Sequence, residues 1–120
     1  MKTVLIADDS RTFRALEQAF LVQRGFRVIQ AGDGAEALRL VYSEKPDLIL
    51  LDIQMPVMDG ASVLATLKSN QSTKTIPVIV ITTIGRDKDR EIMLRGGADD
   101  FISKPINGAE LLKKVKRLLE

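Results

Sequence analysis

The feature that most limits the fold of this chain is a run of four apolar residues that ends on a carboxylate. Residues 48–51 are apolar without interruption, and Asp52 follows them. Such a run predicts a short strand, at about 47–51, that is buried on both faces as in a parallel sheet. Because ligands of open parallel sheets bind beyond the carboxyl ends of the strands, Asp52 occupies a position where chemistry is expected.

Apolar strand-like runs alternate with helix-like segments along the rest of the chain. Further strands are predicted at about 3–7, 26–30, 77–82 and 99–102, and helices at about 10–24, from 33, at 59–69, at 87–95 and from 107. Ser10 is expected to cap the first helix, which should bury Phe13, Leu16 and Phe20 on one face. Alternating βα units predict an α/β fold, a flavodoxin-like three-layer sandwich with five helices and a five-stranded parallel sheet in the order 2-1-3-4-5.

The length and composition indicate one domain, residues 1–120, of an ordinary globular protein. The chain has no cysteine, which excludes thiol catalysis and zinc fingers, and no histidine, which excludes Ser-His catalysis. No secretion signal and no apolar run of about 18 residues is present, so we expect a cytoplasmic protein with no membrane partner. A net charge of +2 is too small to indicate nucleic acid.

Charged and polar residues follow several of the predicted strands. Asp8 and Asp9 come after the first strand, and in the expected order that strand lies beside the one ending at Asp52, about 4.8 Å away. Three converging carboxylates require a proton or a cation, and oxygen ligands alone suit Mg²⁺. Thr82 and Lys104 end the fourth and fifth strands, so a hydroxyl and an ammonium join the acidic groups. Such a pocket is suited to hold a phosphoryl group while a carboxylate attacks in line.

Each of these residues has a simpler explanation when taken alone. An aspartate can cap a helix or a turn, a threonine is common in strands, and a lysine is usually solvated. The combination at the carboxyl ends of four strands is what indicates a site.

With these residues in place, the chain resembles a receiver domain of two-component response regulators, close in length to the single-domain chemotaxis regulators. The resemblance covers Lys2 to about Leu119. It is carried by Asp8-Asp9, by Asp52 with Met55-Pro56 and Asp59-Gly60 downstream, by Thr82, and by Phe101-Ile102-Ser103-Lys104-Pro105.

The resemblance implies a role for each matching residue. Asp52 would be the phosphoacceptor, and Mg²⁺ would be bound by Asp9, Asp52 and the Gln54 backbone carbonyl, with Asp8 acting mainly through water. Thr82 and Lys104 would contact the phosphoryl oxygens, Thr82 and Phe101 would form the switch, and the peptide bond before Pro105 would be cis. Gln54, Thr83 and Ile84 would tune hydrolysis of the acyl phosphate, and Ile84 predicts a long-lived phosphorylated form.

By the same resemblance, the function would be that of a phosphorylation-activated switch rather than an enzyme. A sensor histidine kinase or phosphotransfer protein would supply the phosphoryl group. A downstream protein would bind the face formed by the fourth helix, the fifth strand and the fifth helix.

Other interpretations fit the sequence less well. A phosphorylation-independent pseudo-receiver would share the fold, but such proteins usually lack part of the acidic set. Residues 32–37 match a GxGxxA dinucleotide pattern, yet Asp33 would place negative charge at the pyrophosphate. A haloacid-dehalogenase-like phosphatase would need Asp-x-Asp after the first strand. The basic cluster at 113–117 is better explained by a solvated helix end than by nucleic-acid binding.

Overall fold

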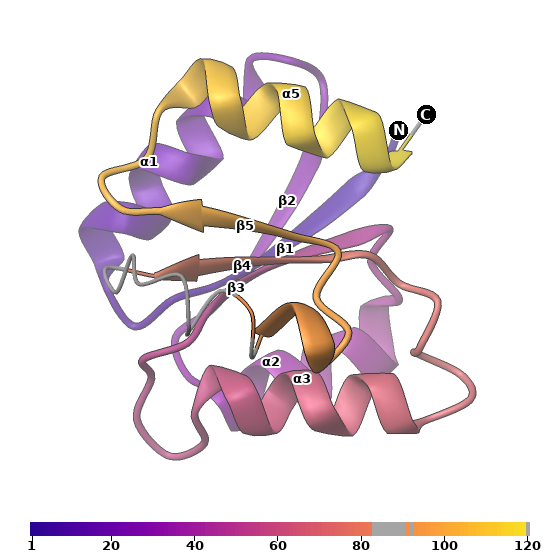
Figure 1. The fold of residues 1–120 in the computed structure, drawn as a ribbon. Coiled ribbons are helices and arrows are strands. Elements are labelled where there is room, and N and C mark those ends of the chain that lie inside the picture. Colours follow the sequence, from indigo (N-terminus) through magenta and orange to yellow (C-terminus); the bar gives the residue numbers. More distant parts are fainter. Residues whose placement is uncertain (83–90, 92, 120) are drawn as a thin grey trace.

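The structure, a computed structural model, describes residues 1–82, 91 and 93–119. Its centre is a five-stranded parallel sheet in the order β2-β1-β3-β4-β5, which confirms the predicted topology (Figure 1). The strands are β1 (Thr3–Ala7), β2 (Arg27–Ala31), β3 (Leu48–Asp52), β4 (Val78–Thr82) and β5 (Asp100–Ser103).

Helices cover both faces of the sheet and make three layers. The helices are α1 (Arg11–Val22), α2 (Gly34–Glu44), α3 (Gly60–Ser69) and α5 (Gly108–Leu119). Figure 1 shows α1 and α5 on one face and α2 and α3 on the other. The helix predicted at about 87–95 falls largely outside the described residues, although residues 93–95 are helical.

The burial of the strands follows their places in the sheet. Every residue of β1, β3 and β4 is buried, as expected for strands that have a neighbour on each side and helices on both faces. β2 lies at an edge of the sheet, and only Ala31 of its five residues is buried, while Arg27 and Gln30 are exposed, as its less continuous apolar pattern predicts. The apolar side chains form two clusters, one on each face of the sheet.

The predicted starts of α1, α2 and α3 are confirmed by their capping hydrogen bonds. The Phe13 amide donates to Ser10 Oγ at 3.2 Å, and the Ser62 amide donates to Asp59 Oδ1 at 2.8 Å. At α2 the Glu36 amide donates to Asp33 Oδ1 at 2.8 Å. Each cap satisfies a backbone donor that the first helical turn leaves without a partner.

The prediction that Leu16 lies on the buried face of α1 is wrong. Leu16 is 39% exposed, whereas Glu17 is 1% exposed and buried together with Leu21. Phe13 and Phe20 are half-buried. Apolar residues at 13, 16 and 20 fit a helical period, but the packing of α1 against the sheet and α5 rotates the buried face onto 17 and 21 instead.

Among the helices in the described part of the chain, none is long and apolar enough to cross a bilayer.

Candidate functional site

The register of the sheet brings the predicted site residues together at its carboxyl edge. Ala7 of β1 pairs with Leu51 of β3, so Asp8 and Asp52 follow at the same level. Thr82 of β4 pairs with Ser103 of β5, and the Lys104 amide then donates to the Thr82 carbonyl at 2.8 Å. Strand register therefore places an ammonium at the same edge as the carboxylates.

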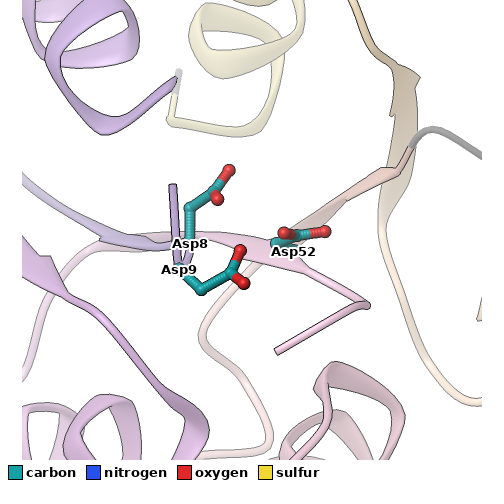
Figure 2. A group of neighbouring side chains, drawn as sticks. All are labelled: Asp8, Asp9 and Asp52. Carbon is teal, nitrogen blue, oxygen red and sulfur yellow. The ribbon is translucent and has the colours of Figure 1, made fainter. Parts of the chain in front are cut away.

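Three carboxylates gather at this edge. Ligand oxygens of Asp8, Asp9 and Asp52 all lie within 4.8 Å of one another. Figure 2 shows the Asp9 side chain extending toward Asp52, while Asp8 turns to the side of the sheet that α1 and α5 cover. Asp8 and Asp52 are buried and Asp9 is exposed, so one side of the cluster is open to solvent. An all-oxygen, acidic and partly open group of this kind could hold a hydrated divalent cation.

The Lys104 ammonium joins two of the carboxylates. Its Nζ lies 2.9 Å from Asp8 Oδ2 and 3.3 Å from Asp52 Oδ2, and its side chain is only 6% exposed. The ring of Phe13 lies beneath it, with Nζ 4.1 Å from the ring centroid. The ammonium offsets part of the negative charge, as a buried cluster of like charges requires.

The electrostatics of the cluster favour protonation of Asp52. Burial, and then the charge of Asp8, raise the pKa of Asp52 to about 6, although Lys104 and the Gln54 amide act against that rise. Burial by itself lowers the pKa of Lys104, but its hydrogen bond to Asp8 and the charge of Asp52 raise it overall. The site is thus short of positive charge, which is the condition in which a bound cation is most favourable.

The loop after β3 folds back closely over Asp52. The Gln54 amide donates to Asp52 Oδ1 at 3.2 Å, and the Gly60 amide donates to the Ile53 carbonyl at 2.8 Å. A Cβ at residue 60 would lie 2.2 Å from the Asp52 carbonyl oxygen, so only glycine fits there. An open hollow beside the loop is lined by Asp9, Gln54 and Asp59 among others.

The other predicted residues are placed as follows. Thr82 is fully buried at the end of β4. Phe101 is 7% exposed, so its ring lies in the core in this conformation. The Lys104–Pro105 peptide bond is cis, as the resemblance implies. Thr83 and Ile84 lie outside the described residues.

Sequence reasoning missed three residues of α1 that belong to the surroundings of the site. Phe13 was assigned to the core, but its ring contacts the lysine; Arg14 Nη1 donates to the Asp8 carbonyl at 2.6 Å. Glu17 was not considered at all. The available signal was its spacing of four residues from Phe13, which places both on one helical face.

The fold and the site together define a class of protein. It is a doubly wound α/β domain with a carboxylate cluster and a lysine at the carboxyl edge of its sheet, an arrangement suited to phosphoryl chemistry. Comparison with known families specifies that class further. The chain belongs to the response regulator receiver domain family, whose sequence profile matches residues 4–116.

The related sequences are regulators of about twice this length. PrrA of Mycobacterium tuberculosis, a transcriptional regulatory protein, is 42% identical over 118 residues, which are 98% of this chain and 49% of PrrA. CpxR of Escherichia coli, also a transcriptional regulatory protein, is 40% identical over 119 residues, which are 99% of this chain and 50% of CpxR. The chain thus spans about half the length of the curated relatives it matches.

Solved structures of similar domains superpose along nearly the whole chain. The receiver domain of the Francisella response regulator 1452 has a TM-score of 0.93 at 30% identity, and the match covers 99% of this chain and 97% of that domain. The chemotaxis protein CheY4 of Vibrio cholerae has a TM-score of 0.92 at 32% identity, covering 99% of each chain. These matches agree with the receiver fold.

Proposed function

We propose that residues 1–120 form one receiver domain that accepts a phosphoryl group on Asp52 and thereby changes its affinity for a protein partner. The observation that carries the proposal is the Lys104 ammonium, held between Asp52 and Asp8 at 3.3 and 2.9 Å beside the exposed Asp9. A carboxylate nucleophile, a cation site and a fixed ammonium are the groups that phosphoryl transfer requires.

The proposed transfer uses few protein groups. A carboxylate oxygen of Asp52 attacks the phosphorus of a phosphohistidine on a sensor kinase or phosphotransfer protein. The P–N bond breaks, and the nitrogen keeps the electron pair. Lys104 and the Thr82 hydroxyl would contact the phosphoryl oxygens. The domain promotes its own modification but turns over no separate substrate, so it acts as a phosphoacceptor rather than as an enzyme.

The acidic cluster fits Mg²⁺ as the cofactor. Asp9, Asp52 and the Gln54 backbone carbonyl would hold the ion, and Asp8 would act mainly through water. Support comes from the oxygen-only donor set and from the open side at Asp9. When bound, the ion neutralises negative charge on the phosphoryl group.

The experiment is phosphorylation by acetyl phosphate in the presence of Mg²⁺, followed by intact-mass analysis. One phosphoryl group should be added to the wild type, and none to Asp52→Asn or to the wild type in chelator. Asp47→Asn is the matched control, because Asp47 precedes the same strand that Asp52 ends, and it should be phosphorylated normally. If Asp52→Asn is still modified, the acceptor is another residue. If the wild type is never modified, a phosphorylation-independent binding module is the better description.

The proposed output surface is the face formed by β5, α5 and the predicted fourth helix. On it, Lys114 Nζ donates to the Phe101 carbonyl at 2.7 Å and pairs with Asp100 at 3.2 Å. The backbone of the proposed switch residue is therefore tied to the surface of α5. Coupling between such sites is typically worth about 1–3 kcal/mol, or roughly 5–150-fold in partner affinity.

The lifetime of the phosphorylated form is proposed to depend on Gln54, Thr83 and Ile84. Ile84 offers no hydrogen bond to orient an attacking water, and Thr83 adds bulk beside it. Replacing Ile84 with glutamate or asparagine should therefore speed phosphate loss, followed by mass after the donor is removed. Unchanged or slower loss would show that Ile84 does not limit access of water.

A further inference from the structure

The loop between β3 and α3 contains a strained turn. Val57 has a φ of +68°, which β-branched residues rarely adopt, and the Met58 amide donates to the Pro56 carbonyl across it at 2.7 Å. A three-residue turn of this kind is uncommon and unfavourable. Val57 is 82% exposed, so burial of its side chain contributes little to holding the turn. Contacts elsewhere in the loop must therefore keep it in this shape.

The start of α2 supplies one such contact. α2 and α3 lie on the same face of the sheet, so the loop that leads into α3 passes the start of α2 (Figure 1). Gly34, the first residue of α2, is buried, and a Cβ there would lie 2.1 Å from the Met58 carbonyl oxygen and 2.8 Å from its carbon. Real atoms do not approach so closely, so the present loop and a side chain at residue 34 exclude each other.

Two hydrogen bonds hold the start of α2 in place. The Glu36 amide donates to Asp33 Oδ1, and the Gly32 amide donates to Glu36 Oε1, each at 2.8 Å. This reciprocal arrangement resembles a capping box and leaves the first turn of the helix little freedom to move. A side chain at residue 34 would therefore displace the loop rather than the helix. The glycine at 34 in the dinucleotide-like pattern of residues 32–37 thus has a use other than binding a nucleotide.

The same loop carries groups of the candidate site. The Gln54 amide donates to Asp52 Oδ1 at 3.2 Å, and the Gln54 carbonyl is a proposed ligand of Mg²⁺. Asp59, at the other end of the loop, lines the open hollow together with Asp9 and Gln54. Met58 is only four residues from Gln54, so a shift of the Met58 backbone has a short path to the site.

We propose that Gly34 is a positioning residue of the site. Its missing side chain lets the loop after β3 close against α2 with the strained turn at Val57, and this closure keeps the Gln54 backbone beside Asp52, ready for a divalent cation. Gly34 acts through Met58 and is not itself a ligand. The inference rests on the proposed Mg²⁺ site, and it assigns the start of α2 a part in that site.

The first pair of variants changes the contact from the side of α2. Gly34→Ala adds the Cβ that the Met58 carbonyl excludes. Gly32→Ala is the matched control two residues away, because a Cβ there meets only Arg14 Nη1, at an ordinary 3.5 Å. If Gly34 served α2 alone, alanine would be at least as good a helix residue as glycine.

The second pair changes the loop and leaves α2 untouched. Val57→Pro fixes φ at about −65° and so forbids the turn, whereas Val57→Gly is the conservative variant that adopts a positive φ without strain. Each of the four variants is measured for Mg²⁺ affinity by calorimetry and for stability in urea. The NMR signal of the Gln54 amide, recorded in chelator, reports the position of the loop without the metal.

Gly34→Ala and Val57→Pro should each weaken Mg²⁺ binding about tenfold and shift the Gln54 amide signal. Gly32→Ala and Val57→Gly should stay within about twofold of the wild-type affinity. A purely structural role of Gly34 predicts lower stability with unchanged affinity and an unchanged amide signal, and that result overturns the proposal. Wild-type affinity in Val57→Pro overturns it as well, because the shape of the loop would then not matter.

Two further outcomes also decide the proposal. If Gly34→Ala does not fold, the exposed Val57 pair takes its place: weaker binding in the proline variant alone supports the proposal, and equal binding overturns it. If the wild type binds no Mg²⁺, the proposed cofactor site fails, and the Gln54 amide signal alone decides the role of Gly34. A shift in Gly34→Ala but not in Gly32→Ala supports that role, and no shift overturns it.

Discussion

The two edges of the sheet use the same residue types in opposite ways. At the amino edge, the Thr3 amide donates to Asp47 Oδ2 at 2.7 Å, and the Val78 amide donates to Asp99 Oδ2 at 2.8 Å. Each aspartate precedes one strand and bonds the first residue of the neighbouring strand. At the carboxyl edge, Asp8 and Asp52 are buried against each other and share one lysine.

The difference separates acids that link neighbouring strands from acids that are buried beside one another. An acid whose oxygens accept backbone hydrogen bonds is satisfied in the folded state, and its removal costs stability. Asp8 and Asp52 also accept backbone hydrogen bonds, from the Ser10 and Gln54 amides, but their like charges are buried close together, and that arrangement becomes favourable only with a compensating cation or proton. Stability measurements can therefore tell the two edges apart.

The largest expected effect is the pH dependence of stability that the buried Glu17 of α1 imposes. The pKa of Glu17 is raised from 4.5 to about 8 by burial first and by Asp8 second, so the folded state holds this proton more tightly than the unfolded state. Its contribution to stability is complete below about pH 4.5 and is lost as the pH rises toward 8. That loss is on the order of 5 kcal/mol at most. Urea unfolding of the wild type without Mg²⁺ should show this decline.

The comparison for that prediction is Glu17→Gln, which cannot titrate. Its stability should fall less than that of the wild type between about pH 4.5 and 8, and the difference isolates Glu17 from Asp52. Parallel curves for the two proteins would show that the Glu17 carboxyl is as well solvated in the folded chain as in the unfolded one.

The next effect is stabilisation by Mg²⁺, which should act through the carboxyl edge alone. At a concentration one hundred times Kd, the ion should raise the free energy of unfolding by about 2.7 kcal/mol. Asp9→Ala should weaken binding more than Asp8→Ala, because direct coordination is proposed for Asp9. A fluorescence or calorimetric titration measures both affinities. Near-equal losses would contradict this division of roles, and Asp99→Asn is the control that should bind normally.

Replacing aspartate with asparagine should change the free energy of unfolding in opposite directions at the two edges of the sheet. Asp99→Asn should lower stability by about 1 kcal/mol, since a charged acceptor for the Val78 amide and an ion partner 3.4 Å from Lys68 Nζ are lost. Asp52→Asn should raise the stability of the metal-free protein by about 1 kcal/mol, since it removes a charge that burial disfavours. Urea unfolding without Mg²⁺ measures both. If both changes destabilise the protein, the contrast between the edges does not hold.

The smallest effect is expected away from both edges, on the surface of α5. Arg117 lies 2.6 Å from Asp100, but its side chain is 58% exposed, and solvent screens the pair. Arg117→Ala should therefore change stability by less than about 1 kcal/mol. A larger loss in thermal or urea unfolding would mean that this pair, unlike a solvated one, supports the β5–α5 contact.

Local pattern was enough to predict the fold and much of the proposed site. The apolar runs of β1, β3 and β4 are buried on both faces, so they are recognisable without knowledge of their neighbours. Because parallel strands end at a common edge, the sequence was enough to predict that residues following them, such as Asp8 and Lys104, lie close together. The helix caps were equally local, since each depends on a side chain three residues away from its amide.

Contacts between segments that are far apart in the sequence could not be predicted from local pattern. The rotation of α1 about its axis depends on how it packs against the sheet and α5, so the sequence alone favoured Leu16 where the structure buries Glu17. The nearer approach of Lys104 to Asp8 than to Asp52 depends on the path of the chain after β5. The roles of Asp47 and Asp99 as links between strands depend on register.

The sequence by itself determined which strands form, in what order they pair, and which acidic and basic residues meet at the carboxyl edge. Those properties follow from short-range periodicity and from the topology of parallel sheets. Only the tertiary structure decided which of these groups is buried, which carboxylate lies nearer to the lysine, and that a glutamate of α1 is buried where an apolar residue was expected. Burial and the choice of partner arise from packing between elements that are far apart in the chain. A rotation of a helix about its axis by one residue position exchanges a buried apolar side chain for a charged one.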